Sequence, residues 1–361
     1  MPSQVAHYLF ADDAVSGCRH GARLEPLSAP ATHRYLVLGA QGPDMFYHNQ
    51  HRRPTAIAYG SLMHRRGYGT AVARMCGWAR RRGLGVESWA GAWIVGFASH
   101  AVLDRRTHPF INAHSGWPVP EDPESDQYRS MHPFLERLID VELLNIRRGI
   151  HPNELGFSDL VDCGDEPHPE WLDLMAKSLA GTYRKAASDG LLVQRLRSAY
   201  LDTLAYYRHT DRIDEGYLER ALAREDAGRI GKRWLSIVHP LDVPEELDVL
   251  NRRRTAWAHP CPDGPATTAS FLDLYDDAVS EASRMIDRIV EVWTLPEEAT
   301  RRAVVDAVMD WNLSDGRPTE RPCAKQYANP RPLAELQDQI RDSIRAGRGG
   351  RLRAARQGTR A

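Results

Sequence analysis

The sequence predicts an all-α protein, and three observations lead to this class. Several long stretches repeat apolar residues at steps of three and four, which is the spacing of one face of a helix. The clearest of them, residues 271–293, carries nine apolar residues at these steps. Only "YLVLG" at 35–39 has the composition of a strand, and no segment repeats at a fixed period, so a solenoid is excluded.

The expected helices follow one another along the chain. Ser28 and Pro30 precede "YLVLG" and favour a short helix that ends at Gly39. Pro109 is expected to stop a long helix that begins near Trp93 and is apolar on most sides. The other helices are expected at 132–139, 172–183 with a close at Asp189-Gly190, 192–207, 271–293, 294–311 and 333–344. In the helix over 294–311, Thr294 and Glu297 have the spacing of a capping box, with Pro296 in the first turn.

The charge balance gives no global field that would attract a nucleic acid or a membrane surface. The chain has 47 basic and 48 acidic residues among its 361, so a nucleic-acid partner is possible but has no support from net charge. Basic residues concentrate only at the C-terminus. Residues 346–361 are therefore expected to form a disordered, Arg/Gly-rich tail.

The cysteines and the apolar segments indicate a cytoplasmic protein. Five widely spaced cysteines without a CxxC pair predict neither a disulfide framework nor a thiolate zinc site. "MPSQVAHYLFADD" lacks a basic region followed by an apolar stretch, so no signal peptide is expected. The longest uncharged run, residues 88–103, is too short to span a bilayer, and no stable membrane span is predicted.

The distribution of histidines and the composition of the loops predict that the chain consists of two helical regions. Segments rich in proline, glycine and acids occur at 114–127 and 156–170, and eleven of the fifteen histidines precede the second one. We therefore expect a metal-binding catalytic helical domain over 1–160. A helical C-terminal region over 165–345 is expected to pack on or beside it, followed by the tail.

One helix face between residues 93 and 110 carries His100, Asp104 and His108 at steps of four. A buried carboxylate there costs several kcal/mol unless it is paired or bound to a metal. The residues alone leave two explanations open. One is a hydrogen-bonded His-Asp pair with an exposed His108 at the helix end, and the other is a metal site.

Further candidates share the same half of the chain. His132 and Glu136 form a second i, i+4 pair of histidine and carboxylate on a partly buried helix. Asp44 follows a Gly-Pro turn that can aim it inward, "SLMHRRGYG" offers His64, and His7 lies on an apolar face with Val5, Leu9 and Phe10. The HExxH, His-Asp, ExxH and GxxxxGK[ST] patterns of other metal and nucleotide sites are absent.

Taken together, these motifs resemble the bacterial zinc-dependent phospholipase C family. The order is His7, "GPD" with Asp44, His64, then HxxxDxxxH from His100 to His108 and HxxxE from His132 to Glu136. More distantly, the pattern is similar to the single-strand-specific zinc nucleases of fungi and plants. The resemblance covers residues 5 to about 140 and implies a multi-helix, phospholipase C-like bundle, here with an additional helical C-terminal region.

The resemblance also implies a cluster of two to three zinc ions. One ion would be held by Asp44, His64, His100 and Asp104, and a second by His108, His132 and Glu136. A third would be held by His7 with Asp104 as a bridge. Secreted family members complete that third site with a processed N-terminal tryptophan, which this sequence does not offer. It is therefore expected to be weaker, completed by groups such as His48 or His51, or empty.

The chemistry implied by the resemblance is hydrolysis of a phosphoric ester by metal-activated water, with Asp44 as the catalytic base. The substrate would be a phospholipid, a nucleotide or a small metabolite. Two alternatives remain open at this point. The chain is either a relative repurposed for a small phosphorylated metabolite or biosynthetic reaction, or a non-catalytic, metal-bound binding module.

Overall fold

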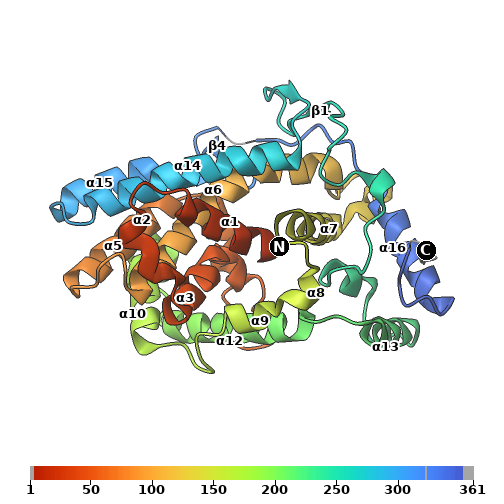
Figure 1. Ribbon diagram of the computed structural model, residues 1–361, viewed down its shortest axis with the longest axis horizontal. Helices are drawn as coiled ribbons and strands as arrows, with labels where there is room; N and C mark the ends of the chain where they lie inside the picture. The colour runs from red at the N-terminus through yellow and green to blue at the C-terminus, as the bar shows by residue number, and fades with distance from the viewer. Residues whose placement is uncertain (1–3, 322, 353–361) are drawn as a thin grey trace, which may run out of the picture.

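A computed structural model describes residues 4–321 and 323–352, and it confirms the all-α class (Figure 1). The α-helices are α1 (Gln4–Ser16), α2 (Gly21–Leu24), α3 (Pro30–Ala40), α4 (Ile57–Arg65), α5 (Tyr68–Arg81), α6 (Trp89–Ser115), α7 (Met131–Arg148), α8 (Pro152–Leu155), α9 (Phe157–Leu160), α10 (Pro169–Thr182), α11 (Arg184–Ala187), α12 (Leu192–Thr210), α13 (Glu215–Asp226), α14 (Phe271–Val292), α15 (Glu297–Val308) and α16 (Leu333–Arg345). The 3-10 helices are η1 (Glu25–Ser28), η2 (Gly42–Phe46), η3 (Pro123–Tyr128), η4 (Lys232–Ser236) and η5 (Glu245–Leu247). Two antiparallel pairs, β1 (Trp257–Ala258) with β2 (Ala266–Thr267) and β3 (Trp311–Asn312) with β4 (Arg317–Pro318), are the described strands.

Helix α6 is the central element, and α1, α3, α5, α7 and α14 pack around it (Figure 1). It has 27 residues, and all but Trp89 and Arg106 are buried. Glycines allow α3 to approach its backbone closely. A Cβ at Gly96 would lie 2.1 Å from the Leu36 carbonyl oxygen, and one at Gly39 would lie 2.4 Å from that of Trp93. This contact fixes the segment that leads into η2.

The expectation that Pro109 stops the long helix is wrong, because α6 continues to Ser115. Proline removes the hydrogen bond that the Arg105 carbonyl would accept within the helix. Gly316 passes directly against that carbonyl, since a Cβ there would lie 2.3 Å from its oxygen. Burial of Phe110 and Ile111 beyond the proline offsets the lost hydrogen bond. The alternative that leaves His108 exposed at the helix end is excluded as well, because α6 continues past it and its side chain is buried.

The other predicted helices are present in the structure, although they begin and end at residues that differ from the predicted ones. The stretch 35–39 is helical and belongs to α3, which ends at Ala40. The capping box predicted for Thr294 and Glu297 is wrong, because α15 begins at Glu297 with Pro296 at its N-cap. Glu297 pairs with Arg81 instead.

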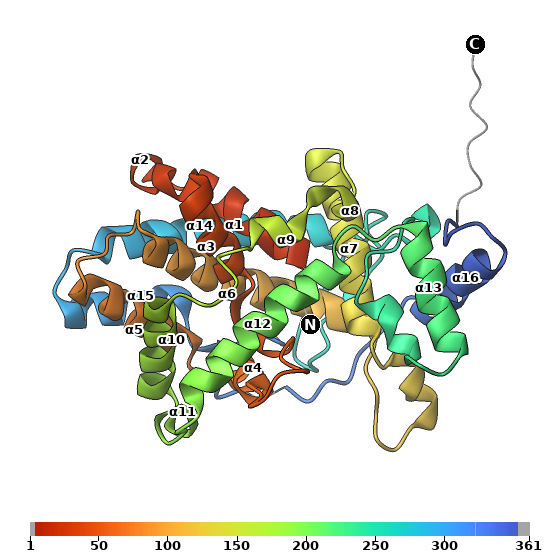
Figure 2. The ribbon, with the colours of Figure 1, turned by 90° about the horizontal axis from the view of Figure 1, so that it is seen from below.

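The C-terminal helices pack directly on the N-terminal ones. Helix α14 lies along α6 and α1, α15 packs on α5, and α12 lies against η2 (Figure 2). No helix among the described residues combines the length and hydropathy needed to cross a bilayer.

Residues 309–321 and 323–331, here called the strap, run from α15 back across α6. The Asn329 and Arg331 amides donate to the carbonyls of Ala113 and His114 at the end of α6. A disulfide between Cys323 of the strap and Cys261 ties it to the loop after β1. The prediction of no disulfide is therefore wrong for this pair. Asp315 lies close to both sulfurs, but a disulfide offers no thiolate to a metal.

The first residues of the predicted disordered tail contact the rest of the fold. Residues 346–352 are described, and Arg351 forms an ion pair with Glu215 with 2.7 Å between Nε and Oε1. The Leu352 amide donates to Asp242 at 3.1 Å. The rest of the predicted tail, residues 353–361, lies outside the described residues.

Candidate metal centre

The structure brings all eight predicted ligands together at the centre of the fold. They are His7 on α1, Asp44 on η2, His64 on α4, His100, Asp104 and His108 on α6, and His132 and Glu136 on α7. Seven of these side chains are at most 7% exposed. His132 is the exception at 28%, so the cluster reaches solvent on its side.

Asp104 lies at the middle of the cluster, and its two oxygens face different histidines. Oδ1 lies 3.2 Å from Nε2 of His7 and 3.7 Å from Nε2 of His108. Oδ2 lies 3.0 Å from Nε2 of His100 and 3.4 Å from Nε2 of His64. The carboxylate therefore has the geometry of a group that can bridge two ions.

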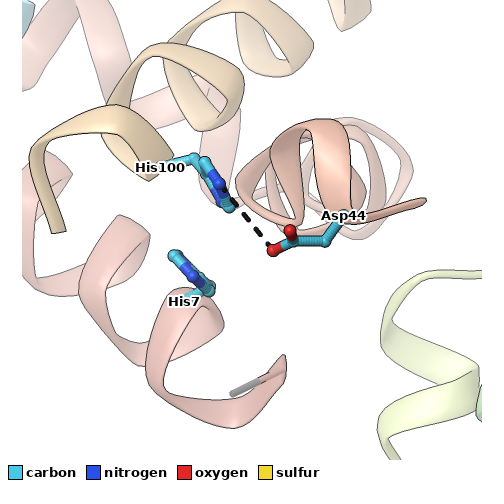
Figure 3. A group of neighbouring side chains, drawn as sticks. All are labelled: His7, Asp44 and His100. Carbon is cyan, nitrogen blue, oxygen red and sulfur yellow. Dashed lines mark ion pairs between the residues drawn. The ribbon is translucent and has the colours of Figure 1, made fainter. Parts of the chain in front are cut away.

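Asp44 approaches the same histidines from η2. Its Oδ1 lies 3.1 Å from Nε2 of His64, and its Oδ2 lies 3.7 Å from Nε2 of His100 (Figure 3). The turn before it needs a glycine, because Gly42 has a φ of +54° and a Cβ there would lie 2.4 Å from Cγ of His100. The His7 ring stacks on His100 with centroids 4.2 Å apart.

The outer part of the cluster joins α6 to α7. Oε1 of Glu136 lies 3.0 Å from Nε2 of His132 and 3.7 Å from Nε2 of His108. Because His132 is the most exposed of these side chains, a ligand from solvent would reach this group first.

Within this cluster, three groups of described side chains could each hold a metal ion, with ligand atoms within 4.8 Å of one another. They are His7, Asp44 and His100; His64, His100 and Asp104; and His108, His132 and Glu136. The last group matches a predicted site. The other two groups differ from the predicted inner sites. In the structure His7 shares a group with Asp44 and His100, whereas the prediction placed it with Asp104 alone.

The histidine hydrogen bonds test whether the residues fit metal ions. Three rings place Nδ1 against a backbone carbonyl: His64 at 2.8 Å from Gly60, His100 at 3.0 Å from Ala40, and His108 at 2.9 Å from Leu313. A neutral imidazole that donates through Nδ1 presents a lone pair at Nε2. In each of these rings Nε2 faces a carboxylate, which also offers only lone pairs. A cation between them satisfies both, and backbone-anchored rings of this kind are typical of metal ligands.

Buried polar atoms without a hydrogen-bond partner also indicate that the cluster can hold metal ions. Among the described residues, Nε2 of His100, Oδ1 of Asp44, Oδ2 of Asp104 and Oε2 of Glu136 are buried without a hydrogen-bond partner. Burial lowers the pKa of His7, and the neighbouring His100 adds to that effect. Burial would raise the pKa of Asp104, but His100 and His108 hold it well below its usual value. Asp104 therefore stays a carboxylate, which is the form that binds a metal. Although burial opposes it, hydrogen bonds to Asp104 and Asp44 raise the pKa of His64 well above its usual value, and Asp104 raises the pKa of His108. A bound cation would take the place of the protons that these carboxylates attract.

Leu313 is a supporting residue that the sequence did not reveal. Its amide donates to the His64 carbonyl at 2.8 Å, and its own carbonyl accepts from Nδ1 of His108. One strap residue thereby positions ligands on α4 and α6. No spacing signal marks this role, because Leu313 is about 200 residues away from His108 in the chain.

Asp140 is a second supporting residue, and here a signal existed. It continues the step of four from His132 and Glu136 along α7. Its Oδ1 accepts the Ala6 amide at 2.8 Å, and its Oδ2 accepts from Nε2 of His239 at 2.9 Å. Asp140 therefore anchors the start of α1, which carries His7.

Neither histidine considered for completing a third site belongs to a metal group. The His48 ring is buried and stacks on Tyr206 with centroids 4.1 Å apart. His51 is exposed, and its amide donates to Asp202. Neither ring therefore takes the place of the missing tryptophan among the described residues.

No protein-family model, curated protein or solved structure matches the chain. The resemblance to zinc-dependent phospholipase C therefore stays a prediction. What the structure itself offers is a buried cluster able to hold metal.

Proposed function

We propose that this protein is a zinc-dependent hydrolase of phosphoric esters, of the phospholipase C or nuclease type. The observation that carries the proposal is the position of Asp104, whose two oxygens face separate pairs of histidines. A bridging carboxylate between closely spaced sites is a common feature of centres that act on phosphate.

The donor set favours zinc over other ions. Five imidazoles and three carboxylates give only nitrogen and oxygen ligands, which zinc binds with low coordination numbers. We assign His64, His100, Asp104 and Asp44 to the inner sites, with His7 beside them. His108, His132 and Glu136 would hold the outer ion.

The chain's own groups supply positioning and proton transfer. Bound zinc would neutralise phosphoryl charge and acidify water. Asp44 is the proposed base, because its Oδ1 is buried without a hydrogen-bond partner among the described residues. The ester would enter beside His132, where the cluster meets solvent. Burial of the inner residues excludes bulk water, which strengthens the electrostatic interactions there.

The compartment is a separate proposal. The sequence favours the cytoplasm, whereas the Cys261–Cys323 disulfide is typical of an oxidising compartment. Cell fractionation with an antibody against the chain distinguishes the cytoplasm from an oxidising compartment, because most of the protein should be found in the fraction of its own compartment.

Metal content and turnover test the function together. The purified protein should contain two or three zinc ions per chain by plasma spectrometry. It should hydrolyse bis-p-nitrophenyl phosphate or p-nitrophenyl phosphocholine, lose that activity with a chelator and regain it with zinc. Phospholipids, single-stranded DNA and RNA, and sugar or nucleoside phosphates form the substrate panel.

A zinc-loaded protein that hydrolyses none of these esters would contradict the enzyme proposal and favour the binding module. Activity confined to sugar or nucleoside phosphates would identify the repurposed metabolite enzyme. Partly buried His33→Gln is a suitable control for loss of a histidine, because His33 pairs with Asp12 and belongs to none of the metal groups.

A further inference from the structure

A basic pocket opens on the surface beside α4. Its volume is about 480 Å³, within the roughly 300–1,000 Å³ typical of small-molecule sites. Four of its lining residues are cationic, no acidic residue lines it, and two carry hydroxyl groups, of which that of Thr319 donates to the Asp310 carbonyl. These six residues are Arg65, Arg66, Lys185, Arg321, Ser61 and Thr319.

The four cations come from three distant segments that the fold brings together. Arg65 and Arg66 lie at the end of α4, Lys185 lies on α11, and Arg321 belongs to the strap. Figure 2 shows α4 and α11 at the same side of the molecule. Gathering like charges is unfavourable unless an anion compensates them.

These cations differ from the other arginines of the same region. Arg52 pairs with Asp202, and Arg195 pairs with Asp189. Within the described part of the chain, by contrast, no carboxylate forms an ion pair with any of the four cations of the basic pocket. Exposed guanidinium and ammonium groups with neighbouring hydroxyls are the donors that recognise phosphate.

The basic pocket is connected to the metal centre through α4. Ser61 faces the pocket, and its Oγ lies 3.5 Å from the Tyr47 hydroxyl. That hydroxyl also lies 3.5 Å from Nδ1 of His64. On the other wall, Asn312 of the pocket precedes Leu313, which holds both His64 and His108. Ser61 on one wall therefore contacts Tyr47, which lies beside His64. Asn312 on the other wall is next in the chain to Leu313, which binds His64 and His108.

We propose that the basic pocket binds a phosphate group of the substrate other than the one that is hydrolysed. The preferred substrates are then phosphodiesters that carry at least one further phosphate. The substrate part of this inference rests on the proposed function, whereas binding of phosphate to the basic pocket does not.

Binding of tripolyphosphate to the zinc-loaded protein tests the pocket directly. The pocket variant is Lys185→Glu with Arg321→Glu, both exposed residues. The control variant, Arg229→Glu with Arg284→Glu, makes the same charge change at exposed positions elsewhere. In calorimetric titrations the pocket variant should bind at least tenfold more weakly, at unchanged zinc content and helicity. The control variant should stay within twofold of the wild type.

Wild-type affinity in the pocket variant would overturn the proposal. Equal losses in both variants would also overturn it, because they would mean a response to net charge alone. If the pocket variant folds poorly, Lys185→Ala with Arg321→Ala replaces it, and a loss of at least threefold is expected.

The substrate part is tested with two p-nitrophenyl esters of thymidine 5′-phosphate, one of which carries an added 3′-phosphate. The 3′-phosphate should lower KM at least fivefold in the wild type and not in the pocket variant, while kcat stays similar. Equal KM values in the wild type would overturn the substrate part. Absence of hydrolysis of both esters would count against the proposed function, and the tripolyphosphate titration would still decide on the basic pocket.

Discussion

The side chain of His7 reaches Asp104 across the interface of α1 and α6, with 3.2 Å between Nε2 and Oδ1. The other oxygen of Asp104 lies 3.0 Å from His100. Asp104 is therefore shared by groups that face different parts of the cluster. Among the described residues, Glu136 in contrast forms its ion pairs with His108 and His132.

This difference predicts unequal losses of zinc. Asp104→Asn removes a negative charge from between two proposed ions, whose mutual repulsion it reduces. Glu136→Gln weakens only the outer site. We expect Asp104→Asn, purified without added metal, to retain less zinc per chain than Glu136→Gln, and both to lose at least tenfold in activity. Plasma spectrometry measures the zinc.

Equal zinc content in both variants and the wild type would contradict the shared site. His33→Gln should keep wild-type zinc and activity. If it does not, the loss reflects general destabilisation of the fold.

The contact of Gly42 with His100 predicts a large effect of one methyl group. A Cβ at Gly42 would lie 2.4 Å from the His100 ring, and the residue has a φ of +54°. Gly83 has a similar φ of +70° but nothing within 4 Å. Both alanine variants should lose about 1–2 kcal/mol from backbone strain. Gly42→Ala should lose a further ~1–3 kcal/mol from overpacking and most of its zinc.

Urea unfolding and metal analysis compare the two alanine variants. If Gly42→Ala and Gly83→Ala have the same stability and zinc content, then η2 does not hold Asp44 against His100 in the way the structure shows.

Local patterns in the sequence predicted the parts of the site that depend on helix periodicity. His100, Asp104 and His108 share a face because they are four residues apart. The same spacing gave His132 and Glu136, and it extends to Asp140. The structure brings these residues together with Asp44, as the resemblance implied.

The remaining parts depend on contacts between residues far apart in the chain. Leu313 supports His64 and His108 through backbone atoms, and any residue type has those atoms. Cys261 and Cys323 are 62 residues apart in segments without a recognisable spacing. The helix passes Pro109 because of burial on all sides, which a local rule about proline does not include.

The Cys261–Cys323 disulfide predicts a redox-dependent stability. It closes a loop of 62 residues, and chain-entropy arguments give about 4 kcal/mol for a loop of this size. Reductant should lower the free energy of unfolding of the wild type by up to that amount. Cys261→Ser with Cys323→Ser should start at the lower value and show no response to reductant.

The three free cysteines serve as the internal control for that measurement. A response to reductant in the double variant would assign the effect to them. A wild type with no response, together with free thiols at both positions by mass spectrometry, would contradict the disulfide.

Buried histidines outside the metal centre predict a loss of stability in mild acid. Burial lowers the pKa of His239 to about 4, although its hydrogen bond to Asp140 opposes the shift. The ordinary value is 6.5, so between these values the unfolded chain binds a proton that the folded chain does not. The contribution of His239 is complete above pH 6.5 and decreases as the pH falls towards 4. The slope approaches about 1.4 kcal/mol per pH unit for one proton.

His239→Gln isolates this contribution, because glutamine can still donate to Asp140 and does not titrate. Unfolding of the zinc-free chain should be followed in urea from pH 7.5 to 4.5 for both proteins. The metal ligands titrate in both, so the difference between the two curves reports on His239. The free energy of unfolding of the variant should decrease less over this range. The difference in slope between the two proteins should be at most about 1.4 kcal/mol per pH unit, the value for one proton. Parallel curves would contradict the lowered pKa of His239, because they would mean that the folded and unfolded chains bind the same number of protons at this histidine.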